Sequence, residues 1–195
     1  MIRRFMGVHC WATLVCTIAG WMVLTGVVFA QTMAPKVGTK APEFALKDVG
    51  GASVALSQER SQGPVVLIVG RGWPGYQCPF CTRQFAEFRS HASELQAAGA
   101  TVLWIYPGPA DELAKHAGDF IGTQPLPPNF RVLIDPGYAF TRAYDLRWDA
   151  PHETAYPATF VVDRDGTVLF ANVSLEHGGR TPVADVLKVL DGMMH

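Results

Sequence analysis

Continuous apolar runs rich in β-branched residues predict the central strands of this chain. The runs 65–69 and 101–106 show no polar alternation, which is typical of strands buried on both faces of a sheet. Alternating apolar residues on either side of Gly50-Gly51 predict a hairpin over 41–56. Similar patterns predict three later strands, the last two joined by a turn at Arg164-Asp165-Gly166: 131–135, 158–163 and 167–171.

A helical apolar period follows the first buried strand. From Cys81 to Leu95, apolar residues recur at spacings of four, three, four and three, which places them on one helical face. We therefore predict a helix over 79–98, with Gly99 as its terminator. Shorter helices are expected over 109–121, over 138–144, and after Thr181, which would cap a helix that has Pro182 in its first position.

The order of these elements predicts an α/β fold. A strand–helix–strand half precedes a strand–strand–helix half, and this is the order of a thioredoxin-like α/β/α sandwich with a mixed central sheet. The early hairpin would add to the sheet, and residues 122–155 would form an insertion between the two halves. We assign 39–195 to this domain and 31–38 to a linker.

The first 30 residues are typical of a targeting segment. Arg3 and Arg4 precede an apolar run over 5–29, and Ala30 offers a small residue for a signal peptidase. The run is also nearly long enough to span a bilayer, so the segment is either a signal peptide cleaved before Gln31 or a retained membrane anchor. Both interpretations predict a periplasmic or otherwise exported domain, with membrane contact only through this segment.

Composition narrows the function classes. The chain has 195 residues, 49% of them hydrophobic and 17% charged, which suits a folded core. The formal net charge is −1, and no basic stripe is present in the sequence. These features argue against a nucleic-acid partner.

The cysteine count points to redox chemistry. Two of the four cysteines, Cys10 and Cys16, lie in the leader, so the exported part keeps only Cys78 and Cys81. A bridge across two residues closes almost no loop and would stabilise the fold little, so the pair suits a disulfide that opens and closes. Zinc would need two more ligands, and the sequence offers neither a second cysteine pair nor closely spaced histidines. We expect no metal and no cofactor beyond this disulfide; inert core cysteines are the remaining alternative.

The position of the pair favours a reactive thiolate. Cys78 would cap the helix, with Pro79 in the first helical position, where its missing N–H costs no hydrogen bond. Free backbone N–H groups and the helix dipole then stabilise a thiolate on Cys78. Cys81 lies one turn further along, shielded by the core, and would resolve a mixed disulfide formed on Cys78.

Two other segments are candidates for the same site. Tyr156-Pro157 precedes a predicted strand, and a cis peptide bond there would place backbone groups beside the cysteines for pairing with an extended substrate. An ordinary proline at a strand start is the alternative. Trp73 and Pro74 precede the cysteines; Trp73 would pack over the pair and either contact partners or only fill space.

These motifs resemble a known family. The chain carries Ala41-Pro42-x-Phe44-x-Leu46-x-Asp48, then Arg71-Gly72-Trp73-Pro74 with Cys78-Pro79-Phe80-Cys81, and later Tyr156-Pro157-Ala158-Thr159-Phe160-Val161-Val162-Asp163. This combination resembles the alkyl hydroperoxide reductase and thiol-specific antioxidant (AhpC/TSA) group, and within it the redoxin or peroxiredoxin-like members with Cys-x-x-Cys. The resemblance implies a thioredoxin fold and thiol chemistry.

The sequence departs from the peroxiredoxin pattern at two positions. That pattern is Pro-x-x-x-Thr-x-x-Cys; here Pro74 matches the proline, Cys78 takes the threonine position and Cys81 the peroxidatic cysteine. A family arginine that stabilises the thiolate corresponds to Pro157. Arg71 and Arg180 are weaker candidates to replace it, and surface positions are the alternative for both.

Three functions follow from these observations. The first is an exported thiol–disulfide oxidoreductase, in which Cys78 attacks a protein or small-molecule disulfide. The second is a thiol peroxidase for hydrogen peroxide or organic hydroperoxides, in which the alignment makes Cys81 the attacking sulfur. The third is a redox-sensing binding module with slow turnover. The partners expected are a thiol reductant, a disulfide-bearing protein or a peroxide.

Overall fold

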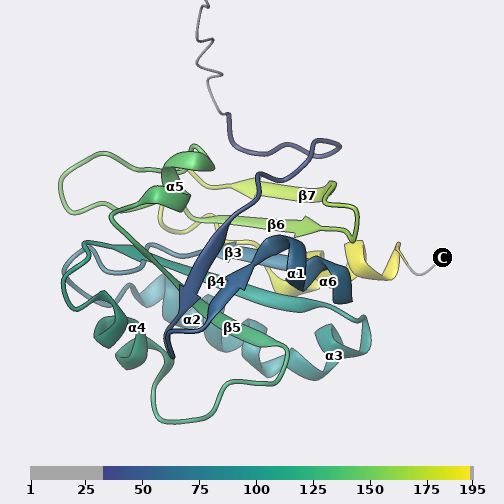
Figure 1. Ribbon diagram of the computed structural model, residues 1–195, viewed down its shortest axis with the longest axis horizontal. Coiled ribbons are helices and arrows are strands. Elements are labelled where there is room, and N and C mark those ends of the chain that lie inside the picture. The colour runs from purple at the N-terminus through teal and green to yellow at the C-terminus, as the bar shows by residue number, and fades with distance from the viewer. Residues whose placement is uncertain (1–32, 194–195) are drawn as a thin grey trace, which may run out of the picture. The chain divides into compact units, whose positions relative to one another are not determined.

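Seven strands form one mixed sheet in the computed structural model, which describes residues 33–193 (Figure 1). The strands are β1 (Ala45–Asp48), β2 (Ser53–Ala55), β3 (Val65–Val69), β4 (Thr101–Gly108), β5 (Phe130–Pro136), β6 (Ala158–Val162) and β7 (Val168–Val173). The helices are α1 (Leu56–Gln62), α2 (Pro79–Ser90), α3 (Ala92–Ala97), α4 (Leu113–Ile121), α5 (Ala139–Ala143) and α6 (Val183–Asp191). The predicted leader, 1–30, and the first residues of the predicted linker lie outside the described residues.

The strand order across the sheet is β2-β1-β5-β4-β3-β6-β7. The central strands β3, β4 and β5 run parallel, whereas β6 and β7 on one side and β1 and β2 on the other pair antiparallel. Both a strand–helix–strand half (β3-α2-β4) and a strand–strand–helix half (β6-β7-α6) are present. The predicted thioredoxin-like α/β class with a mixed sheet is therefore confirmed.

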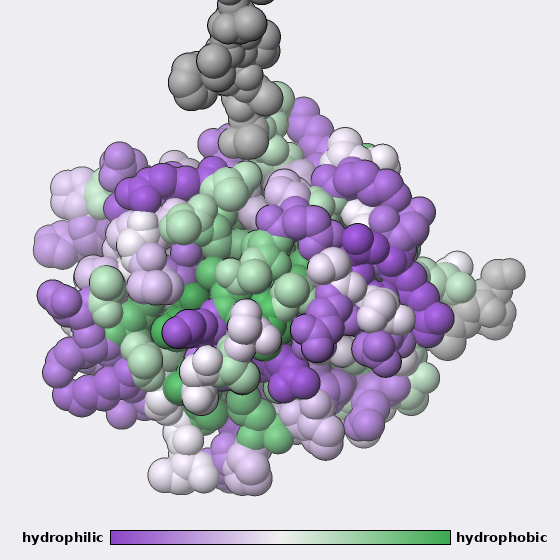
Figure 2. Space-filling view, viewed as in Figure 1, coloured by the Kyte–Doolittle hydropathy of each residue, from purple (hydrophilic) through white to green (hydrophobic). Residues whose placement is uncertain are grey.

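Helices cover both faces of the sheet, and each face has its own apolar core. One core packs side chains of α2, α3, α4 and α6 against the sheet. The other is built with the short helices α1 and α5, which lie nearer the viewer in Figure 1. Figure 2 shows this second face, with apolar residues gathered near its middle and polar residues around them. The three layers match the sandwich predicted from the element order.

The helix that follows β3 forms as predicted but is broken once. Cys81, Phe85 and Phe88 are buried along α2, and the chain continues as α3 after His91. At the break, the Ser90 hydroxyl donates to the Glu87 carbonyl at 2.7 Å, and His91 Nδ1 lies 2.9 Å from the same oxygen. Side-chain hydrogen bonds of this kind compete with the helical backbone and bend it.

One helix was not predicted, and two helices begin at other residues than the sequence predicted. α1 was not predicted, because only Leu56 is buried along this polar segment. α4 begins at Leu113 rather than near residue 109, since Glu112 has a left-handed φ of 54° that a helix does not accept. α6 begins at Val183, with Pro182 rather than Thr181 as the cap. The Val183 N–H donates instead to Glu87 Oε1 at 2.9 Å.

The predicted insertion, 122–155, contributes a strand to the middle of the sheet. It contains β5, which pairs with β4 on one side and with β1 on the other. It also contains α5 and a loop that returns toward β6 through an isolated bridge between Arg147 and Ala155. Strand β5 of the insertion thus pairs with the hairpin β1-β2, and the last residues of the insertion lie near the cysteine pair. No helix in the described part of the chain is long and apolar enough to cross a membrane.

Candidate functional site

The two cysteines lie at the start of α2, at the carboxyl ends of the parallel strands. Cys78 is the N-cap and has extended backbone angles (φ −75°, ψ 117°), and Pro79 follows inside the first turn, as predicted. The Thr82 N–H donates to the Cys78 carbonyl at 3.0 Å, which begins the helical ladder. Cys78 therefore lies at the amino end of α2, where the helix dipole favours negative charge, and the Cys81 backbone N–H helps to lower the pKa of Cys78.

Both thiols are free and nearly completely buried. Cys78 is 1% exposed and Cys81 is 2% exposed. The sequence predicted shielding for Cys81 alone. The Arg71 backbone N–H donates to Cys81 Sγ at 3.3 Å, and Arg180 Nη2 lies 3.2 Å from Cys81 Sγ and 3.8 Å from Cys78 Sγ. Arg180 thus lies against both sulfurs, which have almost no exposed surface.

The pKa values of the two thiols move in opposite directions. The hydrogen bond from Cys81, with further help from the positive charge of Arg180, lowers the pKa of Cys78 to about 5 against the opposing effect of burial. The Cys81 thiol donates this hydrogen bond. The bond and burial together raise the pKa of Cys81 well above its ordinary value. Between these limits the pair holds one proton, which the two thiols share as a coupled pair.

Arg71 and Arg180 occupy different places in the site. The Arg71 guanidinium is 2% exposed, and each of its nitrogens has a hydrogen-bond partner other than a sulfur. Its Nε donates to Glu153 Oε2 at 2.9 Å, its Nη1 to the Tyr76 hydroxyl at 2.8 Å and its Nη2 to the His152 carbonyl at 2.9 Å. Arg71 donates its backbone N–H to Cys81 Sγ, and its side chain adds the smallest of the contributions that lower the pKa of Cys78. Arg180 is the arginine whose guanidinium lies within hydrogen-bond reach of both sulfurs.

Arg180 comes from the loop between β7 and α6. Its Nε donates to the His177 carbonyl at 3.0 Å and its Nη1 to Gln84 Oε1 at 3.2 Å. Gln84 is a buried polar residue of α2, one turn after Cys81, and sequence reasoning missed it. The sequence signal that could have found Gln84 is a polar residue inside an otherwise apolar helical face.

Trp73 and Pro74 lie in the loop that precedes the cysteines. The ring of Trp73 stacks on His116 with centroids 3.6 Å apart and planes 8° apart. Its backbone N–H donates to the Pro107 carbonyl at 2.9 Å, and the half-buried Pro74 follows it in the loop. Trp73 therefore packs in the loop beside β4, and a contact between Trp73 and a partner stays a prediction.

The predicted cis peptide bond at Tyr156-Pro157 is wrong. No cis peptide bond occurs between residues 33 and 193. The Tyr156 N–H donates to the Leu146 carbonyl at 2.8 Å, and the Pro157 carbonyl accepts from the Ser174 N–H at 2.8 Å. The trans backbone is thus hydrogen-bonded within the protein, and the Tyr156 ring stacks on Trp148 at 4.7 Å.

Sequence reasoning missed two further groups near the thiols. Tyr106 on β4 donates its hydroxyl to Gln77 Oε1 at 2.9 Å, and burial raises the pKa of this hydroxyl. Glu153, at the end of the insertion, accepts from Arg71 and also lies 3.0 Å from His177 Nε2. A buried tyrosine in a strand and an acidic residue in a loop carry no sequence signal that links them to the cysteines.

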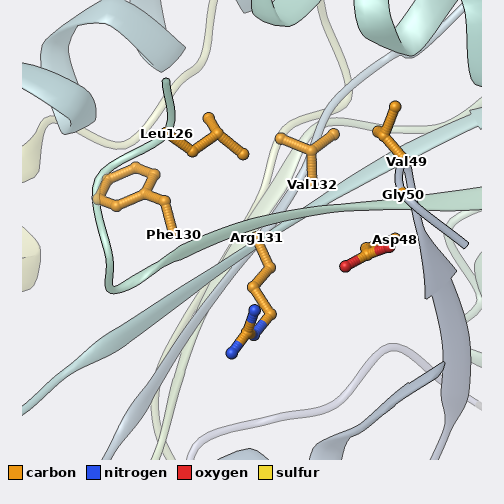
Figure 3. A pocket seen from close by; sticks show the side chains of 7 residues that line it. All are labelled: Asp48, Val49, Gly50, Leu126, Phe130, Arg131 and Val132. Carbon is orange, nitrogen blue, oxygen red and sulfur yellow. The ribbon is translucent and has the colours of Figure 1, made fainter. Parts of the chain in front are cut away.

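One cavity of the structure lies away from the cysteines. A cavity of about 130 Å³ lies between the β1–β2 turn and the start of β5, with Leu126 and Val132 among its walls and Arg131 pointing away from both (Figure 3). It sits at the amino end of β5, whereas the cysteines lie at the carboxyl end of β3. Within residues 33–193, no three His, Cys, Asp or Glu side chains are grouped as metal ligands.

The fold and the paired thiols define a thiol-dependent oxidoreductase with thioredoxin-like architecture. The AhpC/TSA family model matches residues 37–171, and the chain belongs to the AhpC/TSA family. A chloroplastic peroxiredoxin Q of Oryza sativa subsp. japonica is 28% identical over 156 residues, which cover 80% of this chain and 67% of that protein.

Two solved structures are also similar. Peroxidoxin BcpB from Mycobacterium tuberculosis is 25% identical with a TM-score of 0.65, over 82% of this chain and 98% of that one. A Chlorobium tepidum protein described as a candidate thiol:disulfide interchange protein DsbE is 26% identical with a TM-score of 0.59, over 80% of this chain and 99% of that one. The chain is thus similar both to proteins named peroxiredoxin or peroxidoxin and to one described as a candidate thiol:disulfide interchange protein.

Proposed function

We propose that this chain is an exported thiol peroxidase that reduces a small hydroperoxide with Cys78 and Cys81. The observation that carries the proposal is the Arg180 guanidinium, which lies within hydrogen-bond reach of both sulfurs of a buried dithiol. A fixed positive group at this place stabilises the thiolate and the negative charge that develops on a departing peroxide oxygen. Arg180 therefore provides the stabilisation of negative charge that the missing family arginine would provide.

Burial of the pair favours a small substrate. Cys78 and Cys81 are 1% and 2% exposed, so a folded protein disulfide has no direct path to either sulfur. The Tyr156 N–H is also hydrogen-bonded to the Leu146 carbonyl, so this donor is not free to pair with an extended peptide. A peroxide of a few atoms needs neither an open surface nor a backbone partner.

The first step places the nucleophile on Cys78. The Cys78 thiolate attacks the distal peroxide oxygen, the O–O bond breaks, and the sulfur is oxidised to a sulfenic acid. The leaving oxygen takes a proton from solvent and departs as water or an alcohol. The lowered pKa of Cys78 keeps this sulfur ionised at neutral pH.

The second step uses the Cys81 thiol, whose proton is retained by its raised pKa. Cys81 sulfur attacks the Cys78 sulfenic acid, the S–O bond breaks, and water leaves with the proton from Cys81. The product is the Cys78–Cys81 disulfide. Two electrons and two protons from an external thiol reductant restore the dithiol.

Thiol–disulfide exchange is the second candidate. It is supported by the similarity to a candidate DsbE protein and by the exposed rings of Tyr76 and Phe80, which are 45% and 41% exposed beside the cysteines. An apolar rim of this kind suits a polypeptide partner once Arg180 moves aside. A redox-sensing module would share this surface but turn over slowly with every reductant.

Export rests on the sequence of residues 1–30, with Arg3, Arg4, the apolar run and Ala30. Amino-terminal sequencing of the protein from a host with a periplasm checks it. A start at Gln31 supports a cleaved signal peptide, and an intact start in the membrane fraction supports an anchor.

The peroxidase is tested with the reduced protein and its Cys78→Ser and Cys81→Ser variants. We expect rapid consumption of hydrogen peroxide by wild type, a sulfenic acid on Cys78 trapped by dimedone in Cys81→Ser, and no fast reaction in Cys78→Ser. A sulfenic acid on Cys81 formed at the wild-type rate in Cys78→Ser would reverse the two roles. Reduction of a protein disulfide that outpaces peroxide reduction would favour the second candidate.

A further inference from the structure

Glu153 connects the two loops that carry the arginines of the site. Its side chain is 12% exposed, and it belongs to the end of the 122–155 insertion. Oε2 accepts from Arg71 Nε at 2.9 Å and lies 2.7 Å from Nη2, while Oε1 lies 3.0 Å from His177 Nε2. One carboxylate thus holds residues that are 82 and 24 positions away in the sequence.

The His177 side of this bridge leads to the sulfurs. The His177 carbonyl accepts from Arg180 Nε at 3.0 Å, and Arg180 Nη2 contacts both cysteine sulfurs. The His177 ring also lies against Trp148, with centroids 5.1 Å apart. Because His177 is tied at its ring and at its carbonyl, its place in the loop fixes the base of the Arg180 guanidinium.

Arg71 also connects Glu153 to the cysteine pair. Arg71 donates its backbone N–H to Cys81 Sγ, and its buried guanidinium is neutralised by Glu153. His152, the residue before Glu153, has a left-handed φ of 61° and offers its carbonyl to Arg71 Nη2. A strained non-glycine conformation at this point persists only where surrounding contacts hold it.

We propose that Glu153 is a positioning residue of the dithiol site, which holds the Arg180 guanidinium over Cys78 and Cys81 through His177. It touches neither sulfur nor the reacting atoms. This inference deepens the proposed function, because it names the group that keeps the replacement arginine in place. It also gives the insertion a role in the chemistry of the site in addition to its strand.

The direction of one measurable change separates this role from a direct electrostatic effect. Removal of a nearby negative charge, with nothing else moved, favours the thiolate and lowers the pKa of Cys78. Release of Arg180 from the sulfurs removes a positive charge from their surroundings and raises that pKa. A positioning role therefore predicts a rise in the variant, opposite to the simple effect of the lost carboxylate.

The test uses Glu153→Gln, which keeps the size of the side chain and its ability to accept from Arg71. The apparent pKa of the Cys78 thiol is taken from the pH dependence of iodoacetamide alkylation in the reduced protein. We expect it to rise by about half a unit to one unit, with a roughly twofold to fivefold slower peroxide reaction at about pH 5, because a smaller fraction of Cys78 is then ionised. Glu176→Gln, one residue before His177 in the same exposed loop, is the matched control and leaves both quantities unchanged.

His177→Gln provides a second variant that leaves the Arg71–Glu153 pair intact. It is expected to raise the same pKa and to add nothing when it is combined with Glu153→Gln, since both act on one connection. An unchanged or lowered Cys78 pKa in folded Glu153→Gln, or in His177→Gln if the former does not fold, refutes the inference. Alkylation needs no peroxide, so a failure of the proposed peroxidase is seen separately, as an unreactive wild type with a normal alkylation profile.

Discussion

Replacement of Arg180 by glutamine is the most direct test of how the site makes its thiolate. The change removes the guanidinium that lies 3.8 Å from Cys78 Sγ and 3.2 Å from Cys81 Sγ. Glutamine keeps a polar group of moderate length but carries no charge. The expected consequence is a higher pKa for Cys78, because its thiolate loses a neighbouring positive charge.

The size of the change follows from the geometry. Two unit charges 3.8 Å apart at an effective dielectric constant of about 20 attract by about 4 kcal/mol, which is an upper limit here. The guanidinium charge is spread over three nitrogens and shared with Cys81 and Gln84, so the smaller value for a charge-assisted hydrogen bond, about 1.5–3 kcal/mol, applies. At about 1.4 kcal/mol for each pH unit, the pKa of Cys78 rises by about one to two units.

The assay is the pH dependence of iodoacetamide alkylation. Wild type has a Cys78 pKa of about 5, and the Arg180→Gln variant is expected to have one of about 6 to 7. At about pH 5.5 the variant then reacts roughly threefold to 25-fold more slowly, because less of its thiol is ionised. At about pH 8.5 the difference disappears or reverses, since a more basic thiolate is intrinsically more nucleophilic.

A matched control is available on α2. Arg83 is exposed and lies two residues after Cys81, so Arg83→Gln removes the same charge without a contact to either sulfur. It should leave the Cys78 pKa where it is in wild type. Easier access in Arg180→Gln would raise alkylation at every pH without moving the midpoint. An unmoved midpoint in Arg180→Gln would therefore refute the assignment of Arg180 as the thiolate-stabilising group.

Three further predictions concern the frame of the site and its response to pH. Gly72→Ala would place a Cβ 1.8 Å from the Pro107 carbonyl oxygen at a φ of 60°, so we expect a loss of more than about 2 kcal/mol in the free energy of unfolding, measured in urea. Tyr76→Phe removes the hydroxyl that accepts from Arg71 and should cost about 1 kcal/mol in the same assay, discounted for exposure. The lowered pKa of Cys78 stabilises the reduced protein fully above its unfolded value near 9.0, and the gain disappears as the pH falls through about 5; Cys78→Ser should abolish this dependence.

The sequence predicted those parts of the fold that local patterns encode. The runs at 65–69 and 101–106 became β3 and β4 because an uninterrupted apolar segment has no stable place except between two covered faces. The helix α1 was missed because its seven residues bury only Leu56 and so have no apolar stripe. The cis bond predicted at Pro157 was wrong, since the geometry there depends on hydrogen bonds to Leu146 and Ser174 that no local pattern encodes.

The residues of the site also divide into those that a local sequence pattern predicts and those that only the folded chain brings together. Cys78, Pro79 and Cys81 were found because helix-start chemistry is local, and spacing alone places both sulfurs together. Arg180 was a weak candidate, since 99 residues separate it from Cys81 and only the folded sheet brings them together. Glu153 was missed because its contact with Arg71 spans 82 residues.

The two departures from the peroxiredoxin pattern are consistent with one another in this site. The family threonine position holds Cys78, so a second sulfur lies where a hydroxyl would be, and the family arginine position holds Pro157. Arg180 reaches both sulfurs from the β7–α6 loop and lies nearer to Cys81, so on its own it would favour a thiolate there. The helix start acts in the opposite sense, because the helix dipole and the Cys81 backbone N–H favour a thiolate on Cys78 and burial disfavours charge on Cys81. In the proposed mechanism the helix start and the hydrogen bond between the thiols select Cys78 as the attacking sulfur, and Arg180 sets how strongly the thiolate is stabilised.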